Sequence, residues 1–238
     1  MKEAIILAGG FGTRLRDVVA DVPKPMAPVG GRPFLTYLLD NLISQGYSRA
    51  VLATGYMHEK VEAYFGCRYR DLTIAYSRET SPLGTGGAIA QALQLCESDC
   101  VTVLNGDTLF LIDHDAFIAA ATKSGCRLAI VTRRVENAGR YGSVESDATS
   151  GLITAFREKD PGMGAGYING GIYRMHRSLL DGYAVGQPFS FEKEILQPLR
   201  ESILAYPFEK SSAGTPGFFI DIGIPEDYLR AQTELPQL

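Results

Sequence analysis

Short apolar stretches alternate with amphipathic helical patterns through the first half of the chain. The apolar stretches, typical of buried strands, cover residues 4–7, 50–54, 72–76, 101–104 and 127–132. The helical patterns between them cover residues 33–46, 57–65, 86–95 and 115–122. This alternation predicts an α/β fold with a mostly parallel sheet covered by helices on both faces. Ligands of such sheets bind beyond the carboxyl ends of the strands, so functional residues are expected in the loops that follow them.

The second half of the chain has a different pattern. Three short strands separated by turns are predicted over residues 141–145, 153–157 and 166–173. A helix over 191–199, ending near Pro198, precedes two further strands over 202–206 and 217–220 and a helix over 225–232. No linker or repeat divides the sequence. We therefore expect one domain over residues 1–238, with an inserted antiparallel portion.

The bulk properties exclude several classes of partner. The chain has 238 residues and a formal net charge of −4, which gives no reason to expect nucleic acid or an anionic membrane as a partner. No apolar stretch is long enough for a signal peptide or a membrane helix, so the cytoplasm is the expected location. The four cysteines have no Cys-x-x-Cys pair and no histidine partner, which predicts reduced, mostly buried thiols.

A glycine-rich stretch over residues 7–15, Leu-Ala-Gly-Gly-Phe-Gly-Thr-Arg-Leu, follows the first predicted strand. Gly9, Gly10 and Gly12 let the backbone approach a ligand closely, and consecutive N–H groups in such a turn attract anions. Thr13 adds a hydroxyl donor, and Arg14 adds a planar cation that binds phosphate oxygens. The stretch predicts a cradle for a nucleotide triphosphate. A tight turn with a surface arginine is the alternative.

Two better-known phosphate loops fit this stretch less well. The Walker A pattern ends in Gly-Lys-Ser/Thr, which is absent here. The dinucleotide fingerprint needs a third glycine at the position of Leu15.

Lys24 lies between two prolines a short distance beyond the glycine-rich stretch. Pro23 and Pro25 restrict the backbone on both sides and favour an extended pose. The ammonium group is therefore expected to make a second phosphate contact, and the alternative is a proline-rich surface turn.

Two aspartates follow apolar strands that are far apart in the sequence. Asp107 stands in Asn-Gly-Asp after the strand over 101–104, and Asp221 stands in Asp-Ile-Gly after the strand over 217–220. Magnesium binds few carboxylates and keeps its other positions for water and phosphate. The pair therefore predicts a shared Mg²⁺ site, whereas each aspartate alone is more typical of a strand-end cap.

Three further segments carry polar residues or glycine in suggestive places. Residues 81–87, Ser-Pro-Leu-Gly-Thr-Gly-Gly, form a second glycine-rich loop suited to lie against a flat ligand. Glu158 and Lys159 follow the strand over 153–157. Asn169-Gly170-Gly171 lies inside a predicted strand, where glycine marks the close approach of a ligand or another backbone.

These motifs, in this order along nearly the whole chain, resemble those of the sugar-1-phosphate nucleotidyltransferases, also called nucleoside-diphosphate-sugar pyrophosphorylases. The shared motifs are Leu-Ala-Gly-Gly-Phe-Gly-Thr-Arg-Leu, Pro-Lys-Pro, Leu-Gly-Thr-Gly-Gly-Ala, Asn-Gly-Asp, Glu-Lys, Asn-Gly-Gly-Ile-Tyr and Asp-Ile-Gly. The segments Val-Pro-Lys-Pro-Met-Ala-Pro, Phe-Ser-Phe-Glu and Phe-Ile-Asp-Ile-Gly-Ile-Pro-Glu-Asp-Tyr are similar to the short guanylyltransferases that act on D-glycero-α-D-manno-heptose 1-phosphate.

The resemblance implies a fold and a division of the chain. The fold would be a Rossmann-like nucleotidyltransferase sandwich without the C-terminal β-helix of many relatives. Residues of about 1–132 would form the nucleotide-binding half and about 133–238 the sugar-binding portion of a single domain. A homodimer is a further expectation.

The resemblance also implies a role for each site residue. Nucleotide binding would involve Leu7, Ala8, Gly9, Gly10, Gly12, Thr13, Arg14, Lys24, Glu79, Pro82, Gly84, Thr85 and Asp107. Binding of the sugar phosphate would involve Asn105, Gly142, Glu158, Lys159, Asn169 and Gly170. Catalysis would rest on Arg14, Lys24, Asp107 and Lys159, and Mg²⁺ would bind to Asp107 and Asp221.

The implied reaction joins a sugar 1-phosphate to a nucleoside triphosphate and releases pyrophosphate. The attacking phosphate oxygen is already ionised at neutral pH, so positioning and charge neutralisation would supply the catalysis. Glu79 stands where the resemblance places the residue that contacts the base. An ionised carboxylate only accepts hydrogen bonds, and guanine offers two adjacent donors, which favours GTP. An exposed loop glutamate without a ligand is the alternative.

Other functions stay open from the sequence alone. Mannose 1-phosphate is the second candidate for the sugar, and a uridylyl- or thymidylyltransferase is the second candidate for the nucleotide. A catalytically silent homologue that binds a nucleotide-sugar and regulates a partner is the alternative of a different class.

Overall fold

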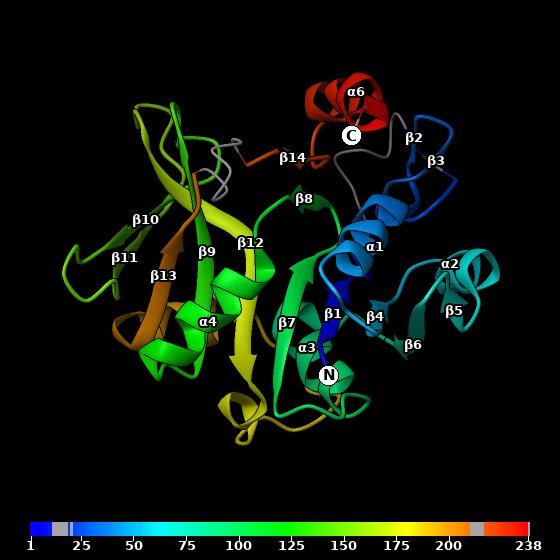
Figure 1. Ribbon diagram of the computed structural model, residues 1–238, viewed down its shortest axis with the longest axis horizontal. Coiled ribbons are helices and arrows are strands. Elements are labelled where there is room, and N and C mark those ends of the chain that lie inside the picture. The colour runs from blue at the N-terminus through cyan, green and yellow to red at the C-terminus, as the bar shows by residue number, and fades with distance from the viewer. Residues whose placement is uncertain (11–18, 20, 210–216, 238) are drawn as a thin grey trace.

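The computed structural model describes residues 1–10, 19, 21–209 and 217–237, and an eight-stranded sheet runs through it (Figure 1). In spatial order its strands are β13 (Ile203–Pro207), β9 (Leu128–Val135), β12 (Gly166–His176), β7 (Cys100–Asn105), β1 (Glu3–Leu7), β4 (Arg49–Thr54), β6 (Leu72–Arg78) and β5 (Arg68–Tyr69). All of them except β12 and β5 run in the same direction. The predicted mostly parallel sheet is confirmed.

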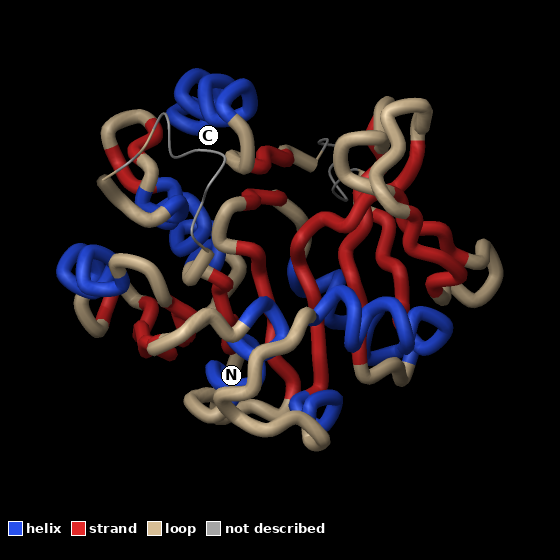
Figure 2. Tube along the Cα trace, turned by 180° about the vertical axis from the view of Figure 1, so that it is seen from behind, coloured by secondary structure: helices blue, strands red, loops and turns tan. Residues whose placement is uncertain are grey.

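Helices cover both faces of this sheet, because neighbouring residues of a buried strand point to opposite sides. Ala4 and Ile6 of β1 pack in one core with α1 (Phe34–Ser44), α2 (His58–Phe65), α4 (His114–Ser124) and α6 (Pro225–Glu234). Ile5 packs in the other core with α3 (Gly84–Leu93). Figure 1 shows α1 and α4 in front of the sheet, and Figure 2 shows it from behind.

The antiparallel portion is distributed differently from the prediction. Strand β12 is part of the main sheet, where it pairs antiparallel with both β7 and β9. Of the three strands predicted for this portion, β10 (Ser143–Ser146) and β11 (Ile153–Arg157) form a separate antiparallel pair. The expected division near residue 132 falls inside β9, so one sheet extends through both halves of the chain.

Two small ribbons place loops beside the main sheet. Strand β8 (Thr108–Phe110) pairs antiparallel with β14 (Phe219–Asp221), which puts Asp221 opposite Thr108. Strand β2 (Pro28–Val29) pairs with β3 (Arg32–Pro33). The short helix η2 (Lys24–Met26) precedes this second ribbon, and two further 3₁₀ segments are η3 (Arg177–Leu180) and η6 (Leu235–Gln237).

The predicted helix over 191–199 is present, and its last α-helical residue is Leu199, directly after Pro198. It starts as a π-helix, η4 (Glu192–Leu196), and continues through α5 (Gln197–Leu199) and η5 (Arg200–Ser202). Pro198 is the second residue of α5 and lies within this continuous helix, where it has no N–H to donate. The Glu194 carbonyl, which an N–H at position 198 would bond in an α-helix, accepts from the Tyr183 hydroxyl at 3.2 Å.

A buried polar chain crosses the face of the sheet that α4 covers. The Tyr47 hydroxyl lies 2.9 Å from His114 Nδ1 and donates to Thr102 Oγ1 at 2.8 Å. His114 is fully buried at the start of α4, and burial lowers its pKa to about 4. The histidine is therefore neutral and structural at physiological pH.

The structure also shows how exposed the cysteines are and whether any helix could span a membrane. The four cysteines are free, but only Cys96 is buried and Cys67 is exposed, so the prediction of mostly buried thiols is wrong. In the part of the chain that the structure describes, none of the helices has the length and apolar character needed to span a membrane.

Candidate functional site

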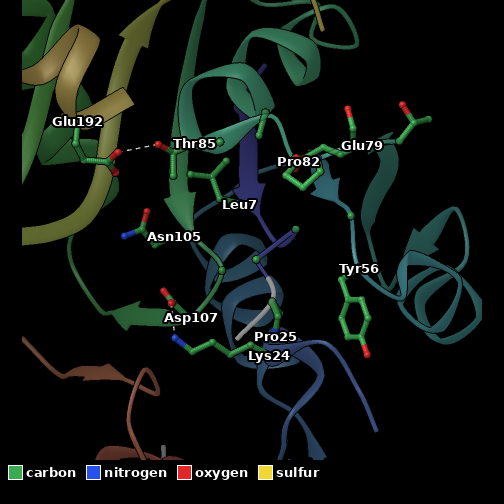
Figure 3. A pocket seen from close by; sticks show the side chains of 18 residues that line it. Leu7, Lys24, Pro25, Tyr56, Glu79, Pro82, Thr85, Asn105, Asp107 and Glu192 are labelled. Carbon is green, nitrogen blue, oxygen red and sulfur yellow. Dashed lines mark hydrogen bonds and ion pairs between the residues drawn. The ribbon is translucent and has the colours of Figure 1, made fainter. Parts of the chain in front are cut away.

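A cavity of about 540 Å³ lies at the carboxyl ends of four neighbouring parallel strands, β7, β1, β4 and β6. Figure 3 shows Glu79, Pro82 and Tyr56 on one side of it, and Asn105, Thr85 and Glu192 on the other. We refer to these two groups of residues as the Glu79 end and the Glu192 end. The predicted residues that line the cavity are Leu7, Gly9, Gly10, Lys24, Glu79, Pro82, Gly84, Thr85, Asn105 and Asp107.

Backbone contacts between strand ends shape the floor of the cavity. The Gly106 N–H donates to the Leu7 carbonyl at 3.0 Å, and a β-carbon added at Gly106 would lie 2.4 Å from that oxygen. A side chain at residue 106 would therefore push β1 and β7 apart at the point where both enter the cavity. The contact between Gly106 and Leu7 therefore explains why the middle residue of Asn-Gly-Asp is glycine.

Glu79 follows β6 and lies at one end of the cavity, close to the glycine-rich stretch. Its Oε2 accepts a hydrogen bond from the Leu83 N–H at 2.9 Å. A β-carbon added at Gly9 would lie 2.5 Å from Glu79 Oε1, so the glycine leaves room for the carboxylate. Burial raises the pKa of Glu79, although the bond from Leu83 opposes this shift. The carboxylate is partly buried and faces the cavity, so the exposed position in the alternative is wrong, whereas the role of Glu79 in binding a ligand stays a prediction.

Lys24 joins the two aspartates that were predicted to share a metal. Its Nζ lies 2.5 Å from Asp107 Oδ2. A β-carbon added at Gly223 would lie 2.8 Å from Asp221 Oδ1 and 3.3 Å from Lys24 Nζ, so the ammonium and the second carboxylate flank the same glycine. Burial and the negative charge of Asp107 raise the pKa of Asp221 to about 6, although Lys24 opposes this shift. The carboxylates of Asp107 and Asp221 therefore lie close together, beside Lys24 and the cavity.

The pairing of β14 with β8 produces this arrangement. Because Asp221 stands opposite Thr108, it lies next to Asp107 despite the long separation in sequence. Among residues 1–10, 19, 21–209 and 217–237, no group of three or more His, Cys, Asp or Glu side chains could hold a metal ion. Two carboxylates are nevertheless sufficient for Mg²⁺, which keeps its remaining positions for water and phosphate.

The second glycine-rich loop packs against the segment around Phe189, and most of its glycines do not face an open cavity. The Gly86 N–H donates to the Phe189 carbonyl at 3.0 Å, and a β-carbon at Gly86 would lie 2.1 Å from a carbon of the Phe189 ring. Gly84 lines the cavity, yet its added β-carbon would lie 2.6 Å from the same carbonyl. The expectation that these glycines leave room for a flat ligand is wrong for Gly86, because the Phe189 ring fills that room.

The hydroxyl of Thr85 is likewise held by the second half of the chain. It donates to Glu192 Oε2 at 2.7 Å and accepts from the Phe191 N–H at 3.0 Å. Thr85 lines the cavity, but its oxygen connects the start of α3 to the segment before η4.

Several residues predicted for the site lie elsewhere in the structure. Ala8 is buried, and its N–H donates to the Ala53 carbonyl at 2.8 Å, so this amide is not available to a phosphate. Gly170 is also buried, because a β-carbon there would lie 2.8 Å from the Phe110 ring. The structure does not bring the following predicted residues to the cavity: Gly142, Glu158, Lys159 and Asn169. Gly12, Thr13 and Arg14 lie outside the described residues.

Several residues that line the cavity were not assigned a role from the sequence, Tyr56 and Glu192 among them. Tyr56 follows β4 in the same way that Glu79 follows β6, so the rule of strand ends could have found it. Glu192 comes from a distant segment, and it is the last residue of the Phe-Ser-Phe-Glu segment that carried the resemblance but was given no role there. Glycines at the start of a helix indicate that a bulky group packs there, but they do not identify the residue that supplies this group.

Comparisons with known proteins identify the family of this chain. The nucleotidyl transferase family model matches residues 3–237. The chain is 41% identical over 233 residues to D-glycero-alpha-D-manno-heptose 1-phosphate guanylyltransferase of Aneurinibacillus thermoaerophilus, with 98% of each chain covered. It is 38% identical over 226 residues to the Campylobacter jejuni protein of the same name, covering 95% of this chain and 96% of that protein.

A more distant relative and a solved structure extend the comparison. A mannose-1-phosphate guanylyltransferase of Mycobacterium tuberculosis is 33% identical over 236 residues, 98% of this chain and 64% of that protein. The crystal structure of HddC from Yersinia pseudotuberculosis complexed with GMP-PN has a TM-score of 0.85 at 34% identity, covering 99% of this chain and 100% of that chain. The chain therefore belongs to the nucleotidyl transferase family, as its motifs predicted.

Proposed function

We propose that this protein transfers a guanylyl group from GTP to a sugar 1-phosphate and releases pyrophosphate. The preferred acceptor is D-glycero-α-D-manno-heptose 1-phosphate, and mannose 1-phosphate is the second candidate. The names of its relatives support the reaction class and the sugar. The observation that carries the choice of nucleotide is the partly buried carboxylate of Glu79 at one end of the cavity.

The chemistry of Glu79 suits guanine better than the other bases. The Leu83 N–H uses one lone pair of Oε2, which leaves acceptor capacity on both carboxylate oxygens. Guanine presents N1–H and the 2-amino group side by side, and both donate. Uracil and thymine present one N–H between two carbonyl oxygens, which a carboxylate repels. A mismatched base would leave buried polar groups without partners, which reduces binding strongly.

The transfer step needs positioning and positive charge more than proton transfer. The sugar phosphate oxygen is an anion at neutral pH, and it must approach a triphosphate that also carries negative charge. Lys24 supplies an ammonium group at the edge of the cavity, and Arg14 is assigned a second cationic contact from its motif. Lys159 is assigned to the phosphate of the acceptor on the same basis.

The same proposal assigns Mg²⁺ to Asp107 and Asp221. Their carboxylate oxygens are hard ligands of the kind that Mg²⁺ prefers. Burial and the nearby charge of Asp107 raise the pKa of Asp221, and a bound cation would offset both effects. When bound, Mg²⁺ supplies positive charge that stabilises the reacting phosphates. Assembly into a homodimer and location in the cytoplasm stay predictions.

The nucleotide is tested by measuring kcat/KM for GTP and dTTP with the wild type and the Glu79→Gln variant. The wild type should favour GTP by roughly a thousandfold or more, because the site is built to accept two hydrogen bonds. In the variant, the glutamine carbonyl keeps the Leu83 bond and its amide N–H faces the base, so dTTP should gain and GTP should lose. An unchanged nucleotide preference in the variant would overturn the assignment of Glu79.

The sugar is tested in parallel with GTP and a panel of acceptors. The panel contains the heptose phosphate, mannose 1-phosphate and glucose 1-phosphate, and pyrophosphate release is the readout. A clear preference for glucose 1-phosphate would contradict the proposed sugar. Absence of release with every pairing of nucleotide and acceptor would contradict the enzymatic function and favour a binding role.

A further inference from the structure

A second carboxylate, Glu192, faces the cavity from the end opposite Glu79. Its Oε2 accepts from the Thr85 hydroxyl at 2.7 Å and from the Ser190 hydroxyl at 3.1 Å. Among the described residues, no partner is found for its Oε1, and Glu192 forms no ion pair. One carboxylate oxygen is thus anchored by the protein, and the other is available to a ligand in the cavity.

The segment that carries Glu192 is fixed to the start of α3. The Phe189 N–H donates to the Leu83 carbonyl at 3.0 Å, and the Phe189 carbonyl accepts from the Gly86 N–H at 3.0 Å. The Phe189 ring packs on Gly86 and stacks on Tyr183 with ring centroids 4.3 Å apart. These contacts hold Glu192 in place before any ligand binds, and such preorganisation favours recognition.

The local backbone at Glu192 is also unusual. Glu192 starts the π-helix η4, and its carbonyl accepts from the N–H of Gln197, five residues later. Wide helical turns of this kind occur mostly as short insertions and are frequent at functional sites. The turn is thus a second sign, independent of the cavity, that this segment has a role beyond packing.

The neighbours of Glu192 identify which ligand it faces. Asn105 lines the same end of the cavity, as Figure 3 shows. Asn169 donates to the Tyr173 hydroxyl at 2.8 Å, and the Tyr173 ring packs edge-on against Phe191, the residue before Glu192. The resemblance assigns Asn105 to the acceptor, and also Asn169, which lies outside the lining of the cavity. On the assignment of Asn105, Glu192 lies at the acceptor end, opposite Glu79.

A carboxylate without a paired cation repels phosphate but accepts hydrogen bonds from hydroxyl groups. A sugar ring presents several hydroxyls, each with one proton to donate. We propose that Glu192 is a specificity-determining residue that accepts hydrogen bonds from hydroxyl groups of the acceptor sugar. This inference rests on the proposed function, because it assumes that the second substrate is a sugar phosphate.

The matched pair of variants is Glu192→Gln and Glu194→Gln. Both remove one negative charge from the same helical turn, but Glu194 does not line the cavity and only accepts from the Ser190 N–H at 3.1 Å. Glu192→Gln should lower kcat/KM for the acceptor by roughly tenfold to a hundredfold, the usual effect of losing a hydrogen bond to a charged group. Glu194→Gln should change it by less than about twofold. GTP binding, measured by calorimetry without acceptor, should be the same in both variants and in the wild type.

A set of deoxy analogues separates recognition from a structural role. The 2-, 3-, 4- and 6-deoxy forms of mannose 1-phosphate are compared in the wild type and in Glu192→Ala. The analogue that lacks the contacted hydroxyl should lose activity in the wild type and lose nothing further in the variant. Equal losses in both proteins for every analogue would overturn the inference, as would weaker GTP binding in Glu192→Gln.

Wild-type turnover is measured first and tests the proposed function independently. If the wild type prefers another sugar phosphate, the same variants and matching deoxy analogues of that sugar are used. If the wild type turns over no sugar phosphate, the proposed function is contradicted and the inference fails with it. If the wild type is active and Glu192→Gln matches it, only the role of Glu192 is wrong.

Discussion

The two ends of the cavity are built in different ways. The Glu79 end consists of residues that directly follow β4 and β6 or precede α3, and its carboxylate is held by Leu83, four positions away. The Glu192 end joins Thr85 to Glu192 across 107 positions, and its shape depends on Phe189 packing against Gly86. The first end is therefore formed by the loops after two neighbouring strands, β4 and β6, that are close in sequence. The second end exists only when the two halves of the chain are packed together.

Lys24, Asp107 and Asp221 lie between these two ends and belong to neither. A change in this central group should impair the reaction without favouring one substrate over the other. A change at either end should affect mainly one substrate. This contrast orders the following predictions from the largest effect on activity to the smallest.

Lys24→Ala should lower kcat by about a hundredfold or more, which corresponds to about 3 kcal/mol for the loss of one preorganised charge contact. The values of KM for GTP and for the sugar phosphate should change much less. Steady-state kinetics with both substrates varied give the measurement. The control is Lys193→Ala, which removes a lysine that does not line the cavity. A variant that lost affinity for only one substrate would place Lys24 at one end of the cavity.

Asp221→Asn should raise the Mg²⁺ concentration needed for half-maximal activity by at least about tenfold, because a direct ligand matters at least as much as the groups that orient ligands. The binding of Mn²⁺ to the protein, measured by electron paramagnetic resonance, should weaken in parallel. The matched control is Asp71→Asn, whose side chain is 93% exposed. Equal metal dependence in wild type and variant would show that Asp221 does not bind the metal.

Gly86→Ala should damage the Glu192 end and destabilise the protein. Its β-carbon would lie 2.1 Å from the Phe189 ring, and stacking on Tyr183 restricts the movement of that ring. Overpacking of this kind costs about 1–3 kcal/mol, which urea unfolding measures. KM for the sugar phosphate should rise more than KM for GTP. The control is Gly182→Ala, where an added β-carbon has no neighbour within 4 Å. Equal increases in both KM values would contradict the separation of the two ends.

Gly9→Ala should disturb only the Glu79 end. The new β-carbon would lie 2.5 Å from Glu79 Oε1, the end of a flexible side chain, and 3.3 Å from the Gly55 backbone nitrogen, so the free energy of unfolding should fall only modestly. KM for GTP should rise by roughly tenfold, the effect expected from weakening one hydrogen bond to a charged group. KM for the sugar phosphate should stay within about twofold of the wild type. A larger change for the sugar phosphate than for GTP would reverse our assignment of the ends.

Protonation of His114 should lower the stability of the protein at acid pH, and it should not favour either end of the cavity. Because its pKa is lowered from 6.5 to about 4, the unfolded chain binds the proton more readily than the folded one between these values. The free energy of unfolding should therefore fall as pH drops from about 6.5 to 4, by up to about 3 kcal/mol. Urea unfolding across this range should show a weaker dependence in His114→Asn. An identical pH dependence in wild type and variant would show that His114 does not titrate as described.

Local patterns were sufficient to predict much of the fold and most of the Glu79 end. The parallel strands β1, β4, β6 and β7 are rich in apolar residues, and ligands of such sheets bind beyond the carboxyl ends of the strands. Leu7, Gly9, Glu79 and Asp107 could therefore be assigned from sequence position and motif. Asp221 was paired with Asp107 from the same pattern of strand, Asp and Gly.

The features that were missed depend on contacts between distant segments. Strands β8 and β14 are too short to give a periodic pattern, so the ribbon that places Asp221 was not predicted. Strand β12 was expected in a separate portion, because nothing in its sequence specifies that it pairs with β7 and β9. Glu192 was not assigned for the same reason, since its position depends on the packing of Phe189.

The close packing of Phe189 on Gly86 makes the two positions interdependent. A larger residue at position 86 can be accommodated only if the side chain at position 189 becomes smaller. In a set of homologous sequences, these two positions should therefore vary together, with bulk moving from one to the other. For protein engineering, the consequence is that the acceptor specificity of this scaffold should be altered by libraries that change positions 86 and 189 as a pair.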